Sequence, residues 1–194
     1  MKKNIGLYFG SFNPIHIGHL IIANYLAEFT DLDEVWLVIS PQSPFKNKAS
    51  LLENHHRYEL VYRALENFDK LKASNIEFDL PTPNYTSKTL AVLAEKHPEY
   101  SFNLIMGEDN LRSLHKWKNY EFILENHKIY VCPRLGDGKI NEDFQSHKNI
   151  HFTNTPIMHI SASLIRDSIQ KGKNIRPMLP NAVWQYIDEM NFYR

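Results

Sequence analysis

Cysteine is almost absent from this 194-residue sequence, which contains only Cys132. A single cysteine cannot form a disulfide within the chain, and a chain of this size without disulfides is typical of a reducing compartment. An excess of charge is absent too, because 22 Lys and Arg residues balance 22 Asp and Glu residues. Binding to nucleic acid or to an anionic membrane depends on many uncompensated basic groups, so we expect neither partner.

Long apolar runs are also missing. No stretch approaches the roughly 20 apolar residues that span a bilayer. The apolar stretch after Lys2 and Lys3 is interrupted by Gly10, Asn13 and Pro14 before it reaches the length of a signal peptide. We therefore expect a cytoplasmic protein. Hydrophobic residues nevertheless make up 43% of the chain, which is enough for one folded domain of ordinary size.

Apolar strands alternate with amphipathic helices along the chain. The pattern predicts strands at 5–9, 35–39, 76–78, 102–106, 128–132 and 149–152, and loops at 40–50 and 133–148. It predicts helices from Pro14 to Phe29 and at 53–68, 86–96, 119–125, 161–171 and 180–190. This order is typical of a single-domain, Rossmann-like α/β fold, doubly wound, with a mostly parallel sheet and helices on both faces. Ligands of such folds bind outside the carboxyl ends of the strands.

The first predicted strand ends in residues 10–19, Gly-Ser-Phe-Asn-Pro-Ile-His-Ile-Gly-His, which open a helix. A helix N-terminus offers free backbone N–H groups and a partial positive charge, both of which suit phosphate. Gly10 and Gly18 allow close approach, and His16 and His19 are one turn apart, so their ring N–H groups can face one anion. Two other interpretations remain open: chance neighbours, and a zinc pair, although no H-E-x-x-H string is present.

Residues 10–19 resemble the G-x-F-x-P-x-H-x-G-H signature of the nucleotidylyltransferase superfamily. Residues 160–166, Ile-Ser-Ala-Ser-Leu-Ile-Arg, resemble the I-S-x-[ST]-x-[IV]-R string that forms the second half of its site. Both strings lie at predicted strand-to-helix positions and occur in the superfamily's order. The resemblance implies one nucleotidylyltransferase domain over 1–194, with the second motif and the terminal helices in 159–194.

Within the superfamily, nearly the whole chain resembles the bacterial nicotinate-nucleotide adenylyltransferases. Segments 40–46, 56–60, 84–90, 105–110, 117–120 and 179–187 are similar to that family's P-x-x-x-P-H-K, R-x-x-M, S-Y-T-x-D-T-L, I-x-G-x-D-N, W-K-x-[WY] and L-P-x-x-V-x-x-Y-I motifs. Two positions depart from these motifs: Phe45 replaces a histidine, and Lys88 replaces an acidic residue. The first change removes one phosphate contact and leaves more of that role to Lys46.

The resemblance implies an enzyme that transfers the adenylyl group of ATP to nicotinate mononucleotide, giving deamido-NAD and pyrophosphate. The implied catalytic residues are His16, His19, Lys46 and Arg166. The implied ATP-binding residues are Gly10, Ser11, Phe12, His16, His19, Gly107, Asp109, Ile160, Ser161, Ser163 and Arg166. The implied mononucleotide-binding residues are Asn13, Lys46, Tyr85, Thr86 and Trp117. Mg²⁺ is expected to arrive with the ATP phosphates rather than in a protein metal site.

Several roles stay open at this point. Ser161 is either a phosphate ligand or a plain N-cap, Asp109 either a ribose ligand or a cap, and Trp117 either a stacking surface or core. The turn at Tyr85 and Thr86 can offer backbone N–H groups to a carboxylate, which favours an acid over an amide substrate.

Alternatives to the implied activity are transfer to nicotinamide mononucleotide, and a nucleotide sensor that does not turn ATP over. Because the chain is neutral overall, positive potential is expected to be concentrated at His16, His19, Lys46, Arg166 and two helix N-termini. Assembly into a homo-oligomer is left open.

Overall fold

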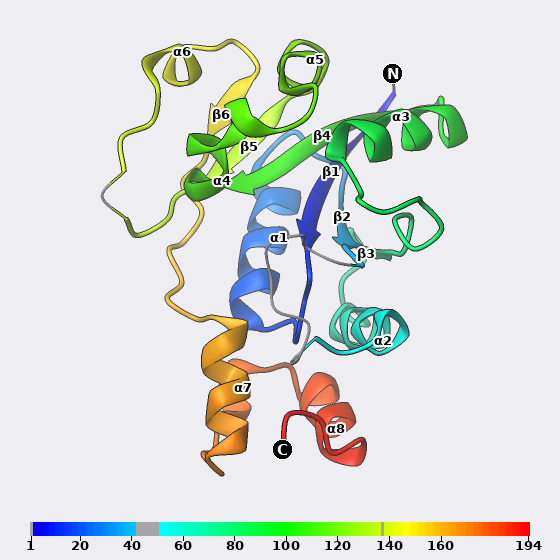
Figure 1. Cartoon of the computed structure of the whole chain (residues 1–194), viewed down its shortest axis with the longest axis vertical. Helices are drawn as coiled ribbons and strands as arrows, with labels where there is room; N and C mark the ends of the chain where they lie inside the picture. Colours follow the sequence, from blue (N-terminus) through cyan, green and yellow to red (C-terminus); the bar gives the residue numbers. More distant parts are fainter. Residues whose placement is uncertain (1, 42–50, 137) are drawn as a thin grey trace.

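Six parallel strands form one sheet in the order β3-β2-β1-β4-β5-β6 (Figure 1). The computed structural model describes residues 2–41, 51–136 and 138–194. The strands are β1 (Lys3–Gly10), β2 (Glu34–Ile39), β3 (Leu71–Ser74), β4 (Tyr100–Gly107), β5 (Ile129–Cys132) and β6 (Ile150–Phe152). After β3 the chain returns to the middle of the sheet, so the strand order reverses between β1 and β4. This doubly wound topology confirms the predicted fold class and makes the β1/β4 junction its ligand-binding switch point.

Helices cover both faces of the sheet, and each face has its own apolar core. The helices are α1 (Ile17–Phe29), α2 (Asn54–Ala64), α3 (Thr86–Lys96), α4 (Glu108–Arg112), α5 (Tyr120–Asn126), α6 (Glu142–Gln145), α7 (Ala162–Gln170) and α8 (Asn181–Glu189), with short 3-10 turns at Leu114–Lys116 and Arg176–Met178. Because side chains alternate along a strand, Tyr8 and Ile105 pack with α1, α2, α7 and α8, whereas Leu7 and Leu104 pack with α3, α4 and α5. Burial on both faces explains why the middle of each inner strand is mostly apolar.

The two last long helices lie beyond the carboxyl end of β1. Figure 1 shows α7 and α8 together at the end of the molecule opposite the N-terminus, with the C-terminus beside α8. Helix α2 packs against α8. This arrangement brings the second sequence motif, which opens α7, to the edge of the sheet where the first motif leaves β1.

One predicted strand is wrong. Residues 76–78 form a turn. The strand that pairs with the outer side of β2 is Leu71–Ser74, and Leu71 lies opposite Val35. Because β3 is an edge strand and only Leu71 in it is buried, it lacks the apolar run that marks the inner strands. Glu77, at the centre of the predicted strand, turns into the protein and is 3% exposed.

The remaining predicted strands and helices are present, with ends shifted by a few residues. The largest shift is in the helix predicted at 53–68, which ends at Ala64. Short helices α4 and α6 were not predicted, and α6 lies inside the segment expected to be a loop at 133–148. No helix in the described part of the chain is long and apolar enough to cross a membrane.

Candidate active site

A cavity of about 540 Å³ opens at the β1/β4 switch point. The carboxyl ends of both strands, the loop between β1 and α1, and the segment that opens α7 all contribute to its walls. The two sequence motifs, about 150 residues apart, therefore face one space. The implied site residues that line it are Gly10, Ser11, Phe12, Asn13, His16, His19, Gly107, Ile160, Ser161, Ser163 and Arg166.

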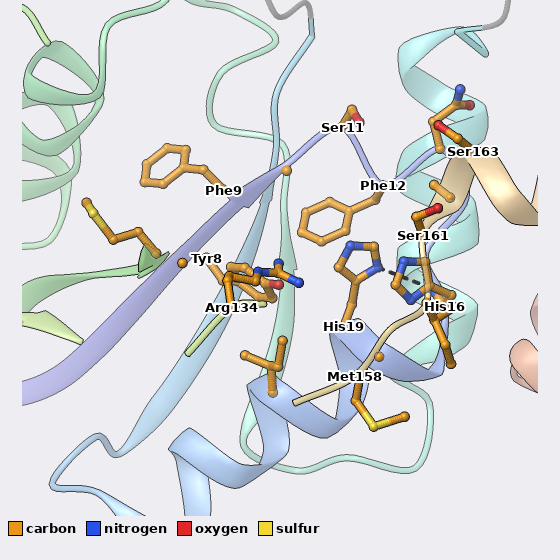
Figure 2. A pocket seen from close by; sticks show the side chains of 18 of the residues that line it. Tyr8, Phe9, Ser11, Phe12, His16, His19, Arg134, Met158, Ser161 and Ser163 are labelled. Atoms are coloured by element: carbon orange, nitrogen blue, oxygen red, sulfur yellow. Dashed lines mark hydrogen bonds between the residues drawn. The ribbon is translucent and has the colours of Figure 1, made fainter. Parts of the chain in front are cut away.

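His16 and His19 form a stacked pair at the start of α1 (Figure 2). Their ring centroids are 3.7 Å apart and their planes differ by 25°. The backbone N–H of His16 donates to His19 Nδ1 at 3.3 Å, which places the proton of a neutral His19 ring on Nε2. His16 is 5% exposed, and its Nδ1 has no hydrogen-bond partner among the described residues. A buried polar atom left unpaired at a cavity wall points to a polar ligand.

The local backbone makes room for this pair. A Cβ on Gly18 would lie 3.1 Å from the His16 ring, so only glycine leaves that ring its position. Phe12 adopts a φ of 44° and is 2% exposed, with its ring edge-on to His19 at 5.1 Å. A Cβ on Gly10 would lie 2.8 Å from the Phe12 ring. The Phe12 side chain thus packs against the His19 ring, while the Phe12 backbone stays available to contact a ligand.

Arg166 joins the second motif to the first. Its Nη1 donates to the backbone oxygen of Asn13 at 2.8 Å, and its Nη2 lies 3.3 Å from Ser163 Oγ. Arg166 follows the N-cap Ser161 by five residues, so the helix turns its guanidinium back toward the cavity. Ser161 Oγ accepts a hydrogen bond from the Leu164 N–H at 3.2 Å, which confirms the N-cap reading of this serine.

The cavity wall combines two arginines with two histidines. Arg134 and Arg166 line it, and no carboxylate belongs to the described lining. Burial, and to a lesser extent the nearby charge of Arg134, lower the pKa of His16 to about 4. His16 is therefore a neutral hydrogen-bonding group, and the positive charge expected on it is carried instead by Arg134. A lining of this kind suits a polyanion.

Asp109 lies just outside this lining, in the first turn of α4. Its Oδ1 is 4.0 Å from Arg134 Nε, and the N-cap of α4 is Gly107, so Asp109 does not cap the helix. A Cβ on Gly107 would collide with the Asp109 carboxylate and lie 3.0 Å from Arg134 Nε. The missing side chain at Gly107 lets the carboxylate and the guanidinium meet beside the end of β4.

The implied mononucleotide side is a separate surface formed by α3 and the segment after α4. Tyr85 is the N-cap of α3 and Thr86 its first residue, and Lys118 Nζ lies 4.5 Å from the centre of the Tyr85 ring. This contact brings the turn at Tyr85 next to Trp117, which is packed in part against the apolar core. None of Tyr85, Thr86 and Trp117 belongs to the cavity lining that the structure describes around His16.

Glu77 anchors the turn that precedes α3. Its carboxylate accepts a hydrogen bond from Thr89 Oγ1 at 2.8 Å, and its backbone oxygen accepts one from Asn84 Nδ2 at 2.9 Å. Burial raises the pKa of the Glu77 carboxyl, while hydrogen bonds from the Thr89 and Ser40 side chains lower it. Glu77 thus links the end of β2 to the first turn of α3.

A cytidylyltransferase-like family model matches residues 7–168 of the chain. Over 194 residues, covering all of both chains, the sequence is 60% identical to a probable nicotinate-nucleotide adenylyltransferase of Christiangramia forsetii. The chain belongs to the nicotinate-nucleotide adenylyltransferase family. A second such protein, from Flavobacterium johnsoniae, is 57% identical over 190 residues, which are 98% of each chain.

Solved structures of this family share the fold. The Plasmodium falciparum nicotinic acid mononucleotide adenylyltransferase complexed with NaAD superposes with a TM-score of 0.81 at 25% identity, over 98% of this chain and 97% of that one. The same Plasmodium enzyme complexed with APC gives a TM-score of 0.80, with the same identity and coverage. The family and the enzyme class predicted from the sequence are confirmed.

Lys46 and Phe45 lie outside the described residues. The segments that flank them are held by Arg57, a fully buried residue of α2 with no carboxylate partner in the described chain. Its guanidinium donates to the backbone oxygens of Ser11, Ser40, Pro41 and Leu52 at 2.7–3.0 Å, and to Asn54 Oδ1 at 2.6 Å. In this adenylyltransferase, Arg57 links the β1–α1 loop to both ends of the segment that contains Lys46.

A zinc pair at His16 and His19 receives no support from the described residues. The group of three potential metal ligands found among them is Glu53, His55 and His56, at the start of α2, and it includes neither histidine of the motif. The described wall of the cavity offers no carboxylate to complete such a site.

Sequence reasoning missed Arg134, Asn110 and Tyr193. Arg134 follows β5 by two residues, so its place after a parallel strand was the available signal, hidden by treating 133–148 as a loop. Asn110 lies in the motif at 105–110, which predicts no role for it, and it lines the cavity. No local pattern marks Tyr193, which contacts Asn13 across 180 residues of sequence.

Proposed function

We propose that this protein transfers the adenylyl group of ATP to nicotinate mononucleotide, giving deamido-NAD and pyrophosphate. The observation that carries the proposal is the single cavity in which Arg166 of the second motif reaches Asn13 of the first, at 2.8 Å, beside the stacked histidines. Membership of the nicotinate-nucleotide adenylyltransferase family, at 60% identity over the whole chain, supports the choice of acceptor.

The proposed chemistry requires little of the protein beyond position and charge. The 5′-phosphate of the mononucleotide attacks the α-phosphorus of ATP, and pyrophosphate leaves. Because the attacking oxygen is already anionic, no general base and no covalent intermediate are needed. Catalysis then consists of aligning two anions and stabilising the charge that grows on the leaving group. A wall that has arginines and imidazoles, and no carboxylate among its described residues, suits that task.

Each motif residue has a part in this reaction. His16 and His19 donate hydrogen bonds to the ATP phosphates, and His16 does so as a neutral ring stacked on His19. Arg166, already fixed by Asn13, contacts the β- and γ-phosphates through its remaining N–H groups. Lys46 serves the transferred and leaving phosphates. The first turns of α1 and α7 add backbone N–H groups, with Ser11, Ser161 and Ser163 beside them.

Magnesium enters this proposal with ATP. The described lining holds no carboxylate, and Asp109 faces Arg134, so these residues fit a metal held mostly by phosphates and water. Bound Mg²⁺ would offset phosphate charge during the transfer. We also propose that the reaction takes place in the cytoplasm, because a chain whose one cysteine is the buried, free Cys132 suits a reducing compartment.

The acceptor side accounts for a preference for the acid. At the start of α3, backbone N–H groups near Tyr85 and Thr86 can donate to the carboxylate of the nicotinate ring, and Trp117 stacks on that ring. The amide nitrogen of a carboxamide would place its own N–H against these donors and leave them unpaired. The enzyme would therefore use the amide less efficiently than the acid. Asn13, which the resemblance also assigns to the mononucleotide, lines the cavity beside His16.

One assay tests the function. The protein is incubated with ATP, Mg²⁺ and either nicotinate or nicotinamide mononucleotide, and pyrophosphate release is measured. We expect fast release with the acid and at least tenfold slower release with the amide. Equal rates would remove the acid preference, and faster release with the amide would assign the other acceptor. ATP binding without release from either mononucleotide would identify a nucleotide sensor.

A further inference from the structure

The last four residues of the chain fold back onto the body of the protein. Helix α8 ends at Glu189, and Asn191 follows with a φ of 54°. The Asn191 N–H donates to the backbone oxygen of Asp188 at 3.2 Å, and the Phe192 N–H donates to the backbone oxygen of Ile187 at 3.0 Å. This pair of bonds is the Schellman arrangement that ends a helix and reverses the chain. The tail after α8 is therefore a defined structure.

Tyr193, the penultimate residue, reaches the phosphate loop from this reversal. Its hydroxyl donates to Asn13 Oδ1 at 2.7 Å, and the Leu52 N–H reaches the same oxygen at 3.2 Å. Tyr193 adopts a φ of 64°, a left-handed conformation that is unfavourable for a non-glycine residue and persists where other contacts hold it. The hydrogen bond between Tyr193 and Asn13 therefore depends on the packing of the tail and not on the backbone preference of Tyr193.

Asn13 connects Tyr193 to the catalytic groups. It is 4% exposed, its side-chain oxygen accepts from Tyr193, and its backbone oxygen accepts from Arg166. Three residues later the same loop reaches His16, the N-cap of α1. A shift of Asn13 would therefore move both the arginine of the second motif and the histidines of the first.

We propose that Tyr193 is a positioning residue for adenylyl transfer: through Asn13 it holds the β1–α1 loop where His16, His19 and Arg166 face the same phosphates. This inference rests on the function proposed above. Because the two substrates keep their own contacts, loosening the loop weakens alignment in the transition state more than it weakens the binding of either substrate. The signature of this role is a fall in kcat with little change in KM.

The surroundings of the Tyr193 hydroxyl favour its use as a donor. Burial raises the pKa of this phenol, and the charges of Arg166 and Arg57 oppose the shift only in part. The hydroxyl therefore keeps its proton throughout the physiological range and donates a hydrogen bond to Asn13 Oδ1. The same tyrosine, with Arg166 and Leu52, lines a second hollow of about 390 Å³ behind the loop.

The test compares two variants that each lose a single hydroxyl. Tyr193→Phe removes the bond to Asn13 and keeps the ring. Tyr186→Phe is the matched control, because its hydroxyl pairs with His56 Nδ1 at 2.9 Å, in the same C-terminal region but away from the loop. For Tyr193→Phe we expect a threefold to tenfold fall in kcat, with both KM values within twofold of those of the unchanged protein. Tyr186→Phe should leave kcat within twofold.

Amide hydrogen exchange supplies a readout that does not need turnover. Residues 11–16 should exchange faster in Tyr193→Phe than in the unchanged protein, and at the unchanged rate in Tyr186→Phe. If the unchanged protein releases no pyrophosphate, the proposed function fails, and exchange alone decides the positioning role. Unaltered kcat and exchange in Tyr193→Phe would overturn the inference, as would equal effects of both variants, which would reveal a general loosening of the C-terminal region.

Discussion

The rings of His16 and His19 stack at 3.7 Å, although like-charged imidazoles repel at that distance. The stack is stable because His16 stays neutral: burial, and then the charge of Arg134, lower its pKa to about 4. The pair therefore combines one buried neutral ring with a second ring held through its Nδ1 by the His16 backbone. We therefore expect His16 to affect the pH dependence of stability and His19 to affect catalysis.

We expect the folded state to lose stability as the pH falls from about 6.5 to about 4. In that interval the unfolded chain protonates His16 and the folded chain does not, so unfolding takes up protons, and the cost is about 1 kcal/mol per pH unit. His16→Gln removes this group from the balance. Urea denaturation at pH 4.5 and 7 should show a smaller loss of stability for the variant. His127, whose pKa burial also lowers, is present in both proteins and cancels in the comparison.

His19→Ala should lower kcat by about 100-fold to 1,000-fold at pH 7, by loss of a donor that faces the ATP phosphates. His55→Ala is the control, since the His55 side chain is 66% exposed at the start of α2. Pyrophosphate release is measured for both, with thermal denaturation to establish that His19→Ala is folded. Full activity in folded His19→Ala would contradict the phosphate role.

The two motifs and the inner strands were predictable because their signals are local. The run at Val35 is apolar on both faces, the run at Phe102 is apolar except for Asn103, and the histidines lie one turn apart at a helix start. The edge strand at Leu71 was not, because only one of its faces is covered and its pairing with Val35 is set by the sheet. The turn at Glu77 mimicked a strand because its buried carboxyl is satisfied by partners that lie elsewhere in the sequence.

Contacts between distant segments also decided which site residues escaped prediction. Arg134 acquires its place beside Asp109 and His16 only when β5 pairs with β4. Tyr193 reaches Asn13 only after α8 has packed on α2. Neither residue has a neighbour in sequence that marks its role. The sequence alone therefore predicts the two motif loops, whereas the residues that fix those loops in space are known only from the packing.

Arg166→Lys should lower kcat/KM for ATP by at least tenfold, and Arg166→Ala by about 100-fold. Lysine keeps the charge but not the planar fork that reaches Asn13 and a phosphate together. Arg176→Lys, a change at a residue that lies over the Trp184 ring, is the control and should leave kcat/KM within twofold. Equal activity of Arg166→Lys and the unchanged protein would show that charge alone is sufficient.

Arg57→Met should destabilise the protein by about 3 to 5 kcal/mol. The guanidinium is fully buried, and its loss leaves four backbone oxygens without the donors that satisfy them. Arg63→Met, on the same helix, removes a half-exposed pair with Glu59 and should cost less than about 1 kcal/mol. Urea denaturation measures both. Similar losses in the two variants would mean that Arg57 does not fasten the surrounding loops.

Trp117→Phe distinguishes a stacking surface from a core residue. If the indole stacks on the pyridine ring, the smaller phenyl ring should raise the KM for nicotinate mononucleotide by about tenfold and leave the KM for ATP unchanged, since base stacking on an aromatic side chain contributes about 1 to 3 kcal/mol. Trp117 also packs against the core beneath α3, so some loss of thermal stability is expected in either case. Trp184→Phe, on α8, is the matched control and should change neither KM. If Trp117→Phe is less stable and both KM values are unchanged, the indole is a core residue. The pyridine ring is then contacted by the turn at Tyr85 and not by Trp117.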